Sequence, residues 1–135
     1  MTAISTRLNE STDSLLRFAM RADAVLTGLA GIAAIPLAGW LSEMSGTTTT
    51  FEYSMSAFFI AYGIVVYALA SLQNVRVPGI AVIVANVAYT VGSVVLVLVD
   101  WMPLTTFGVV MTLATGVYTA AFAELQYQGV RRIKA

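Results

Sequence analysis

Apolar residues along this chain fall in four long stretches that short polar connectors separate. Each stretch is close to the ~20 residues that an α-helix needs to cross ~30 Å of hydrocarbon. Because a helix satisfies its backbone hydrogen bonds within one segment, even the Val-rich run at 94–99 is predicted to be helical. The predicted spans are residues 22–41, 53–72, 79–99 and 104–124.

The short connectors predict a compact arrangement of these spans. Pro78 and Pro103 stand where a helix can accept proline, in its first turn. We therefore expect an all-α membrane protein with one domain, residues 1–135, built as an antiparallel bundle of four transmembrane helices. Residues 1–21 are predicted to be a cytoplasmic polar or interfacial segment or an extension of the first span, and residues 125–135 a cytoplasmic basic tail.

The two halves of the chain match each other at several positions. Asp23 and Thr27 in the first span have the spacing of Asn86 and Thr90 in the third. Spans two and four share identical residues at a constant offset: Ala61, Gly63, Ala68, Ala70, Leu72 and Gln73 against Ala114, Gly116, Ala121, Ala123, Leu125 and Gln126. A duplicated two-helix hairpin would produce this pattern, a 2+2 parallel repeat with its axis along the membrane normal. The alternative is chance similarity between helices rich in Ala and Gly.

The charges are few, and their positions predict an orientation. The sequence is 59% apolar and 10% charged, whereas soluble domains are roughly 25% charged. All basic residues lie before the first span, between the second and third, or after the fourth: Arg7, Arg17, Arg21, Arg76, Arg131, Arg132 and Lys134. The positive-inside rule places these segments, and both chain ends, in the cytoplasm. The net charge of zero gives no general attraction to nucleic acid.

The chain contains neither Cys nor His. This composition excludes disulfides, thiol chemistry, Cys or His zinc sites and His-ligated haem. We therefore predict no enzymatic activity, catalytic residues, cofactor or metal site.

Polar residues near the cytoplasmic ends of the spans are candidates for a site. Asp23 and Asn86 occupy matching places in the two halves, and Glu124 lies near the end of span four. Ionisable residues at such positions are functional candidates. Two carboxylates would repel each other unless an Arg lay between them or one took a proton. We expect an inner polar cluster of Asp23, Asn86 and Glu124 with Arg21. The cluster would either fix the bundle or form a functional site.

Two further sets of residues have helical spacing. Thr112, Thr115 and Thr119 form a stripe on span four, which is either structural or the lining of a polar path. Small residues are the usual means of close helix approach in membranes, within one chain or between the copies of a homo-oligomer. The candidate packing residues are Gly28, Gly63 and Gly116.

Three stretches carry a resemblance to other proteins: residues 16–31, residues 84–86, and the ending at residues 122–132, which contains Ala123-Glu124-Leu125-Gln126 and a pair of arginines. Together they resemble a group of small bacterial four-span membrane proteins of uncharacterised function. The resemblance implies this topology and the bacterial inner membrane, and no activity. Exporters of the small multidrug resistance type have a similar size but carry a Glu deep in the first span, where this chain has only Asp23 at the expected edge.

The expected function follows from the short connectors and the missing catalytic groups. We predict a structural, accessory or self-associating membrane module. The alternative is an oligomeric transporter or channel for a small solute. The expected partners are the lipid bilayer and either further copies of the chain or a membrane-complex subunit, and no nucleic acid.

Overall fold

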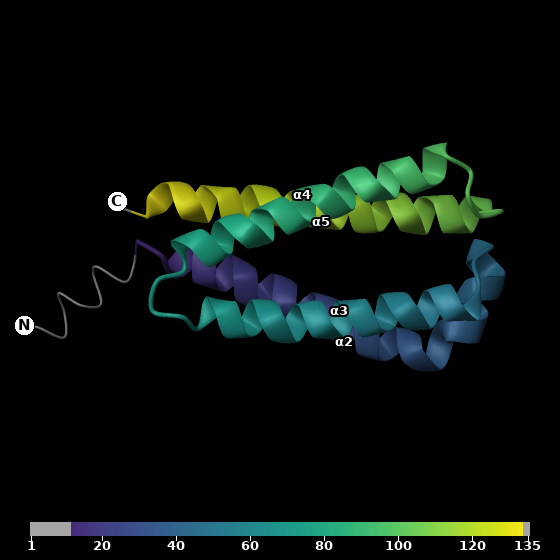
Figure 1. Ribbon diagram of the computed structural model, residues 1–135, viewed down its shortest axis with the longest axis horizontal. Helices are drawn as coiled ribbons and strands as arrows, with labels where there is room; N and C mark the ends of the chain where they lie inside the picture. The colour runs from purple at the N-terminus through teal and green to yellow at the C-terminus, as the bar shows by residue number, and fades with distance from the viewer. Residues whose placement is uncertain (1–11, 134–135) are drawn as a thin grey trace, which may run out of the picture.

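The computed structural model describes residues 12–133, and every regular element in this range is a helix. The helices are α2 (Ser14–Ser45), α3 (Thr49–Ala70), α4 (Arg76–Leu98) and α5 (Thr106–Arg132). All four are long and apolar enough to cross a membrane, which confirms the prediction of four apolar helices. They lie lengthwise beside one another, with the α3–α4 connector and both ends of the described chain at one end of the molecule (Figure 1).

Two helices are longer than the predicted spans. Helix α2 begins at Ser14, so it includes residues 14–21, which were predicted to precede the first span or to extend it. Helix α5 extends to Arg132 and includes most of the predicted basic tail. Residues 1–11 and 134–135 of the expected terminal segments lie outside the described residues. Local signals set the other boundaries. The Thr48 and Thr105 hydroxyls accept backbone N–H bonds at the starts of α3 and α5, and Gly46, with a φ of 77°, ends α2.

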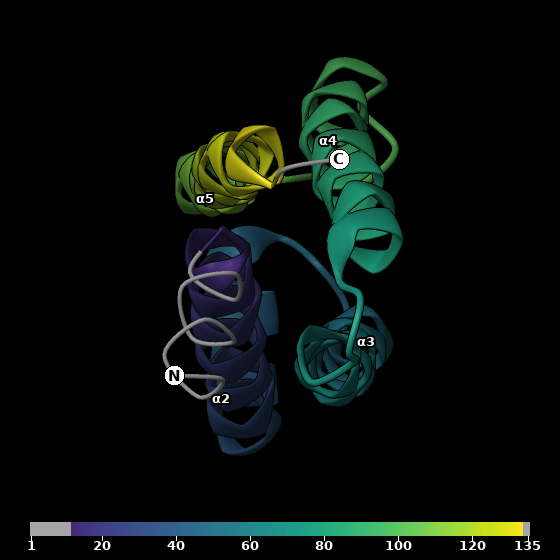
Figure 2. The ribbon, with the colours of Figure 1, turned by 90° about the vertical axis from the view of Figure 1, so that its left-hand side faces the viewer.

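The helices pack unequally around the bundle. Helix α2 packs along α3, α4 packs along α5, and α2 also contacts α5, whereas α3 and α4 touch over a short stretch only. The view along the molecule shows the helices at four corners, with α4 above α3 (Figure 2). The α3–α4 side is therefore the loosely packed side of the bundle.

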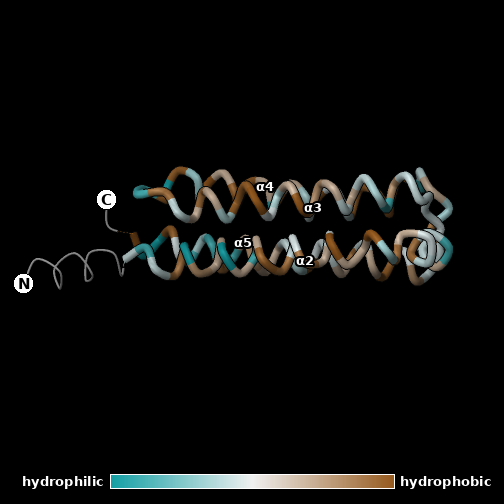
Figure 3. Tube along the Cα trace, turned by 90° about the horizontal axis from the view of Figure 1, so that it is seen from below, coloured by the Kyte–Doolittle hydropathy of each residue, from teal (hydrophilic) through white to brown (hydrophobic). Residues whose placement is uncertain are grey.

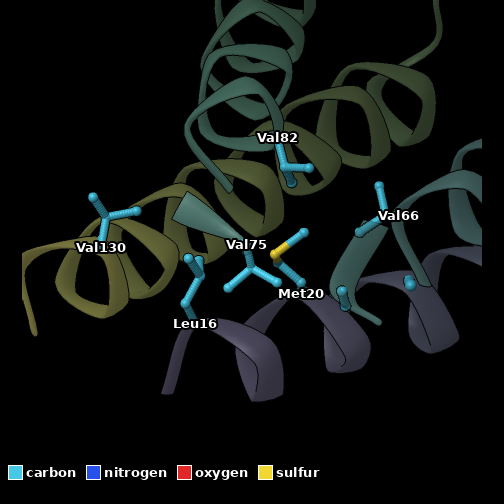
Figure 4. Close-up of a cluster of buried hydrophobic side chains, with 8 residues drawn as sticks. Leu16, Met20, Val66, Val75, Val82 and Val130 are labelled. Carbon is cyan, nitrogen blue, oxygen red and sulfur yellow. The ribbon is translucent and has the colours of Figure 1, made fainter. Parts of the chain in front are cut away.

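A hydrophobic cluster closes the end of the bundle where α2 begins, which we call the Arg17 end. Its side chains come from all four helices and from Val75 in the α3–α4 connector (Figure 4). Leu16 is fully buried between Gly79 and Gly129, where a Cβ atom would lie 2.6 Å and 2.7 Å from Leu16 atoms. The largest members are Leu16, Met20, Val66, Val75, Val82 and Val130.

Backbone contacts fix the opposite end, which we call the Ser45 end. The Thr105 N–H donates to the Ser45 carbonyl at 3.0 Å, and the Thr105 hydroxyl donates to the Met44 carbonyl. Gly108 lies so close to Ser45 that a methyl group would overlap the Ser45 carbonyl. Helices α2 and α5 are therefore joined at both ends of the bundle.

The outward surface of the bundle is apolar. Large hydrophobic side chains such as Ile64, Leu98 and Val117 are more than half exposed. Apolar residues recur along the full length of the helices (Figure 3). Soluble proteins rarely expose continuous apolar surface of this extent, whereas a bilayer matches it.

Candidate functional site

Asp23 lies inside the bundle and is fully buried, with 0% of its surface exposed. Six residues earlier, Arg17 donates to the Ala70 carbonyl and so marks the level at which α3 ends. At 1.5 Å per residue, Asp23 is about 9 Å deeper along α2 than Arg17. The sequence suggested a residue at the edge of the span, and the early start of α2 explains the difference.

Side chains from all four helices donate to the Asp23 carboxylate. Its Oδ2 atom accepts from the Tyr62 hydroxyl of α3 at 2.7 Å, and from the Asn86 and Gln126 amides of α4 and α5 at 3.0 Å each. Its Oδ1 atom accepts from the Thr27 hydroxyl at 3.0 Å and the Tyr118 hydroxyl at 3.2 Å. We call these six residues the Asp23 hub.

The members of the hub also bond to one another. The Asn86 amide donates to the Gln126 side-chain oxygen at 2.9 Å, and the hydroxyls of Thr27 and Tyr118 lie 2.9 Å apart. Among the described residues, every buried side-chain nitrogen and oxygen has a hydrogen-bond partner. A carboxylate is acceptor-only when ionised, and the surrounding hydroxyls and amides supply the donors that this form needs.

The hub lacks a positively charged partner among residues 12–133. The ion pair in this range joins Arg17 to Asp13 at 3.0 Å. Arg21 lies over the Tyr67 ring, 5.9 Å from its centroid, and donates to the Ala70 carbonyl at 3.5 Å. A buried charge is costly unless it is paired or well hydrogen-bonded. The side chains that donate to Asp23 here are all neutral.

The expected Asp23–Arg–Glu124 cluster is wrong. The structure brings Asp23 and Asn86 together, but Glu124 is exposed and accepts a hydrogen bond from Gln128 at 2.8 Å. The buried face of α5 advances in steps of three or four residues and passes through position 126 instead. That face contains Gly116, Thr119, Ala123, Gln126 and Val130.

Sequence reasoning missed the roles of Gln126, Tyr62 and Tyr118. Gln126 carried a signal, because it matches Gln73 in the repeat and lies three residues after the small residue Ala123. Tyr62 and Tyr118 carried a weaker signal, because a tyrosine hydroxyl within an apolar span needs a hydrogen-bond partner.

A cavity of about 250 Å³ lies beside the hub, with residues of all four helices in its wall. Four hub residues line it, Thr27, Tyr62, Asn86 and Tyr118, and they cover Asp23. Most of the remaining wall is apolar or aromatic. The cavity therefore places an apolar space one side-chain layer away from the carboxylate.

Two residues of the threonine stripe of α5, Thr115 and Thr119, contact α4. Thr115 accepts from the Tyr89 hydroxyl at 3.2 Å, and Thr119 lies 2.7 Å from the Thr90 hydroxyl. Both also donate to carbonyls of their own helix, as threonine does in apolar surroundings. Thr115 and Thr119 line the cavity, whereas Thr112 contributes its carbonyl to Thr115 and does not line it.

The candidate glycines differ in how closely they are packed. A Cβ atom at Gly63 would lie 2.6 Å from the Ala24 carbonyl oxygen, and one at Gly116 would overlap the Ser93 hydroxyl. A Cβ atom at Gly28 would lie 3.9 Å from the Gly63 Cα, which is ordinary contact. Gly63 and Gly116 thus stand at the close approaches within the two hairpins.

Comparison with known proteins gives no match: no protein-family model, no curated protein and no solved structure matches the chain. The function therefore has to be argued from the geometry of the hub and the cavity.

Proposed function

We propose that this chain is a non-enzymatic membrane module, with a structural, accessory or self-associating role, whose helices the Asp23 hub holds together. The observation that carries the proposal is one buried carboxyl group, that of Asp23, which accepts hydrogen bonds from α2, α3, α4 and α5. In lipid, packing and interhelical hydrogen bonds replace the hydrophobic effect as the forces that join helices.

The saturation of the hub supports a non-enzymatic role. Each polar group around Asp23 is already committed to another group of the hub, so its polar atoms bond inward. A general base needs hydrogen-bond reach to a substrate proton, and Thr27, Tyr62 and Asn86 separate Asp23 from the cavity.

The finer architecture is part of the same proposal: an antiparallel bundle with a 2+2 internal repeat. Asp23 and Asn86, which match in the repeat, meet in the hub at 3.0 Å. The repeat-matched Gly63 and Gly116 each make a close approach to the other helix of their own hairpin. A duplicated hairpin supplies a reason for both relations.

We also propose the bacterial inner membrane as the location, with both chain ends in the cytoplasm. The support is the resemblance to small bacterial four-span proteins and the distribution of basic residues. Those that the structure describes lie near the starts of α2 and α4 and at the end of α5: Arg17, Arg21, Arg76, Arg131 and Arg132. These three points lie at the Arg17 end (Figure 1).

A groove on the α2–α3 side favours association with a further helix. Its volume is about 520 Å³, and its wall includes the small residues Ala24, Gly28, Gly63 and Ala68. Small residues let helix backbones approach closely in a bilayer. A second copy or a partner subunit is the proposed occupant.

The test of the module function is Asp23→Asn. The new amide would place donor hydrogens against the hub's donors, so we expect a loss of about 1–3 kcal/mol in the free energy of unfolding. Denaturant titration in detergent, followed by circular dichroism and by oligomeric state, measures this effect. The matched control is Glu124→Gln, which neutralises an exposed carboxylate and should leave both readouts unchanged. Equal stability of both variants and wild type would refute a holding role for the hub.

A second candidate is a transporter or channel for a small solute. The cavity favours it, because all four helices line it in the middle of the bundle and hub residues form part of its wall. The hydrophobic cluster at the Arg17 end closes the bundle beneath the hub, so transport would require that cluster to open.

A further inference from the structure

Aromatic rings line much of the cavity beside the hub. They come from three helices and are Phe58, Phe59, Tyr62, Tyr89 and Tyr118. The ring centroids of Phe58 and Tyr62 lie 6.3 Å apart, and those of Phe59 and Tyr89 lie 6.1 Å apart across the α3–α4 side. The face of an aromatic ring carries negative charge density and attracts cations.

The buried carboxyl group of Asp23 lies behind this aromatic wall. The hydroxyl of Tyr62 reaches Asp23 at 2.7 Å, and Tyr118 reaches it at 3.2 Å. Asp23 has no ion-pair partner within residues 12–133. In a medium of low dielectric constant, an ionised carboxylate acts across one layer of side chains with little screening.

The loosely packed side of the bundle gives access to the cavity. Helices α3 and α4 touch over a short stretch only, and Phe58, which lines the cavity, is 51% exposed. A compound dissolved in the hydrocarbon of the bilayer could approach between these helices. Helices α2 and α5, by contrast, contact each other at both ends of the bundle.

We propose that the cavity binds a small organic cation, an ammonium group that carries an aromatic or short alkyl body. The aromatic rings of the wall and the Asp23 carboxyl group favour the charge, and the apolar wall favours the body. A volume of about 250 Å³ is just below the ~300–1,000 Å³ typical of ligand pockets, so the body is small. A metal ion fits poorly, because hard cations need several free oxygen ligands and the Asp23 oxygens are already occupied by donors.

The experiment compares benzyltrimethylammonium with neopentylbenzene, a neutral molecule of the same shape. Equilibrium dialysis against the purified full chain in detergent micelles, with empty micelles as the blank, gives a Kd for each. We expect the cation to bind at least ten-fold more tightly than the neutral molecule. Equal affinities would overturn the charge argument.

Variants then locate the site. Ala114→Phe fills the cavity and should weaken cation binding at least ten-fold, whereas Ala120→Phe, on the same helix and outside the wall, should not. Tyr89 bonds to Thr115 and lies outside the hub, so Tyr89→Leu removes a ring without removing a hub bond. Tyr89→Leu should weaken cation binding. Tyr89→Phe, which keeps the ring, should bind the cation as tightly as the wild type does.

Two outcomes of these variants would contradict the proposed site. Unchanged binding in folded Ala114→Phe, or in Tyr89→Leu, would refute the site. The proposed binding does not depend on the module function, and a failure here leaves the unfolding result for Asp23→Asn as it stands.

Discussion

The lack of a side chain at Gly63 allows α2 and α3 to approach closely. A Cβ atom there would lie 2.6 Å from the Ala24 carbonyl oxygen and 3.1 Å from the Gly28 Cα. Both neighbours are backbone atoms, so they can move only if a whole helix moves. Gly39 and Gly92 lie in α2 and α4 with nothing within 4 Å of their added Cβ atoms. The same residue type is therefore essential for packing at one position and replaceable at two others.

Gly63→Ala should lower the free energy of unfolding by about 1–3 kcal/mol, because the methyl group overpacks the α2–α3 contact. Gly39→Ala and Gly92→Ala are the controls. Each should be neutral or slightly stabilising, since alanine is the better helix former. Unfolding of the three variants in mixed micelles, followed by circular dichroism, gives the comparison. A Gly63→Ala protein as stable as the controls would show that α3 can shift at no cost.

At the scale of the element, Arg17 of α2 completes the end of α3. Its guanidinium donates to the carbonyls of Ala70, Leu72 and Gln73 at 2.8, 2.6 and 2.9 Å. The last carbonyls of a helix lack partners within the helix and form the negative end of its dipole. A planar cation with several donors, itself paired to Asp13, here satisfies the Ala70 carbonyl of α3 and the Leu72 and Gln73 carbonyls of the connector that follows it.

Arg17→Lys should destabilise the bundle by about 1 kcal/mol although the charge is kept, because an ammonium group cannot reproduce the fork of donors. Arg76→Lys is the matched control at an exposed position near the same end. The measurement is the thermal unfolding midpoint in detergent. If both lysine variants melt together with the wild type, the carbonyls of α3 are satisfied without Arg17.

At the scale of the whole molecule, the proposed orientation can be tested with fusions. A reporter that is active only outside the cytoplasm should be active when fused after Thr48 or Met102, in the connectors at the Ser45 end. It should be inactive when fused after Arg76 or at the chain's last residue. The basic residues near the Arg17 end are the physical reason. An active fusion at the last residue would reverse or abolish the proposed topology.

The sequence predicted the elements of this fold better than their contacts. Hydropathy and span length indicated four apolar helices, because the bilayer constrains length and composition strongly. Boundaries were less accurate: polar residues before position 22 belong to α2, since a helix continues beyond the hydrocarbon at little cost.

The contacts of the candidate site were predicted in part. Asp23 and Asn86 could be paired from their matching positions, and the structure places them 3.0 Å apart. The prediction placed Glu124 in the cluster, where the structure has Gln126 instead. The charge of a residue does not show which side of α5 it occupies, and the buried side of α5 contains Gln126. The cavity could not be predicted, since it arises from the unequal packing of helices that the sequence does not specify.

The hub also constrains the order in which the protein can be completed. Asp23 is synthesised 103 residues before Gln126, and the helices that contribute Tyr62, Asn86 and Gln126 emerge one after another. A nascent chain that has released only α2 into lipid carries a carboxyl group whose partner Thr27 is present but whose partners on the other three helices do not yet exist. Each later helix removes part of that cost, and α5 removes the last of it. The buried acid thus links the cost of holding the first helix in lipid to the arrival of the fourth, and a chain that stops early leaves the Asp23 carboxyl group short of hydrogen-bond donors.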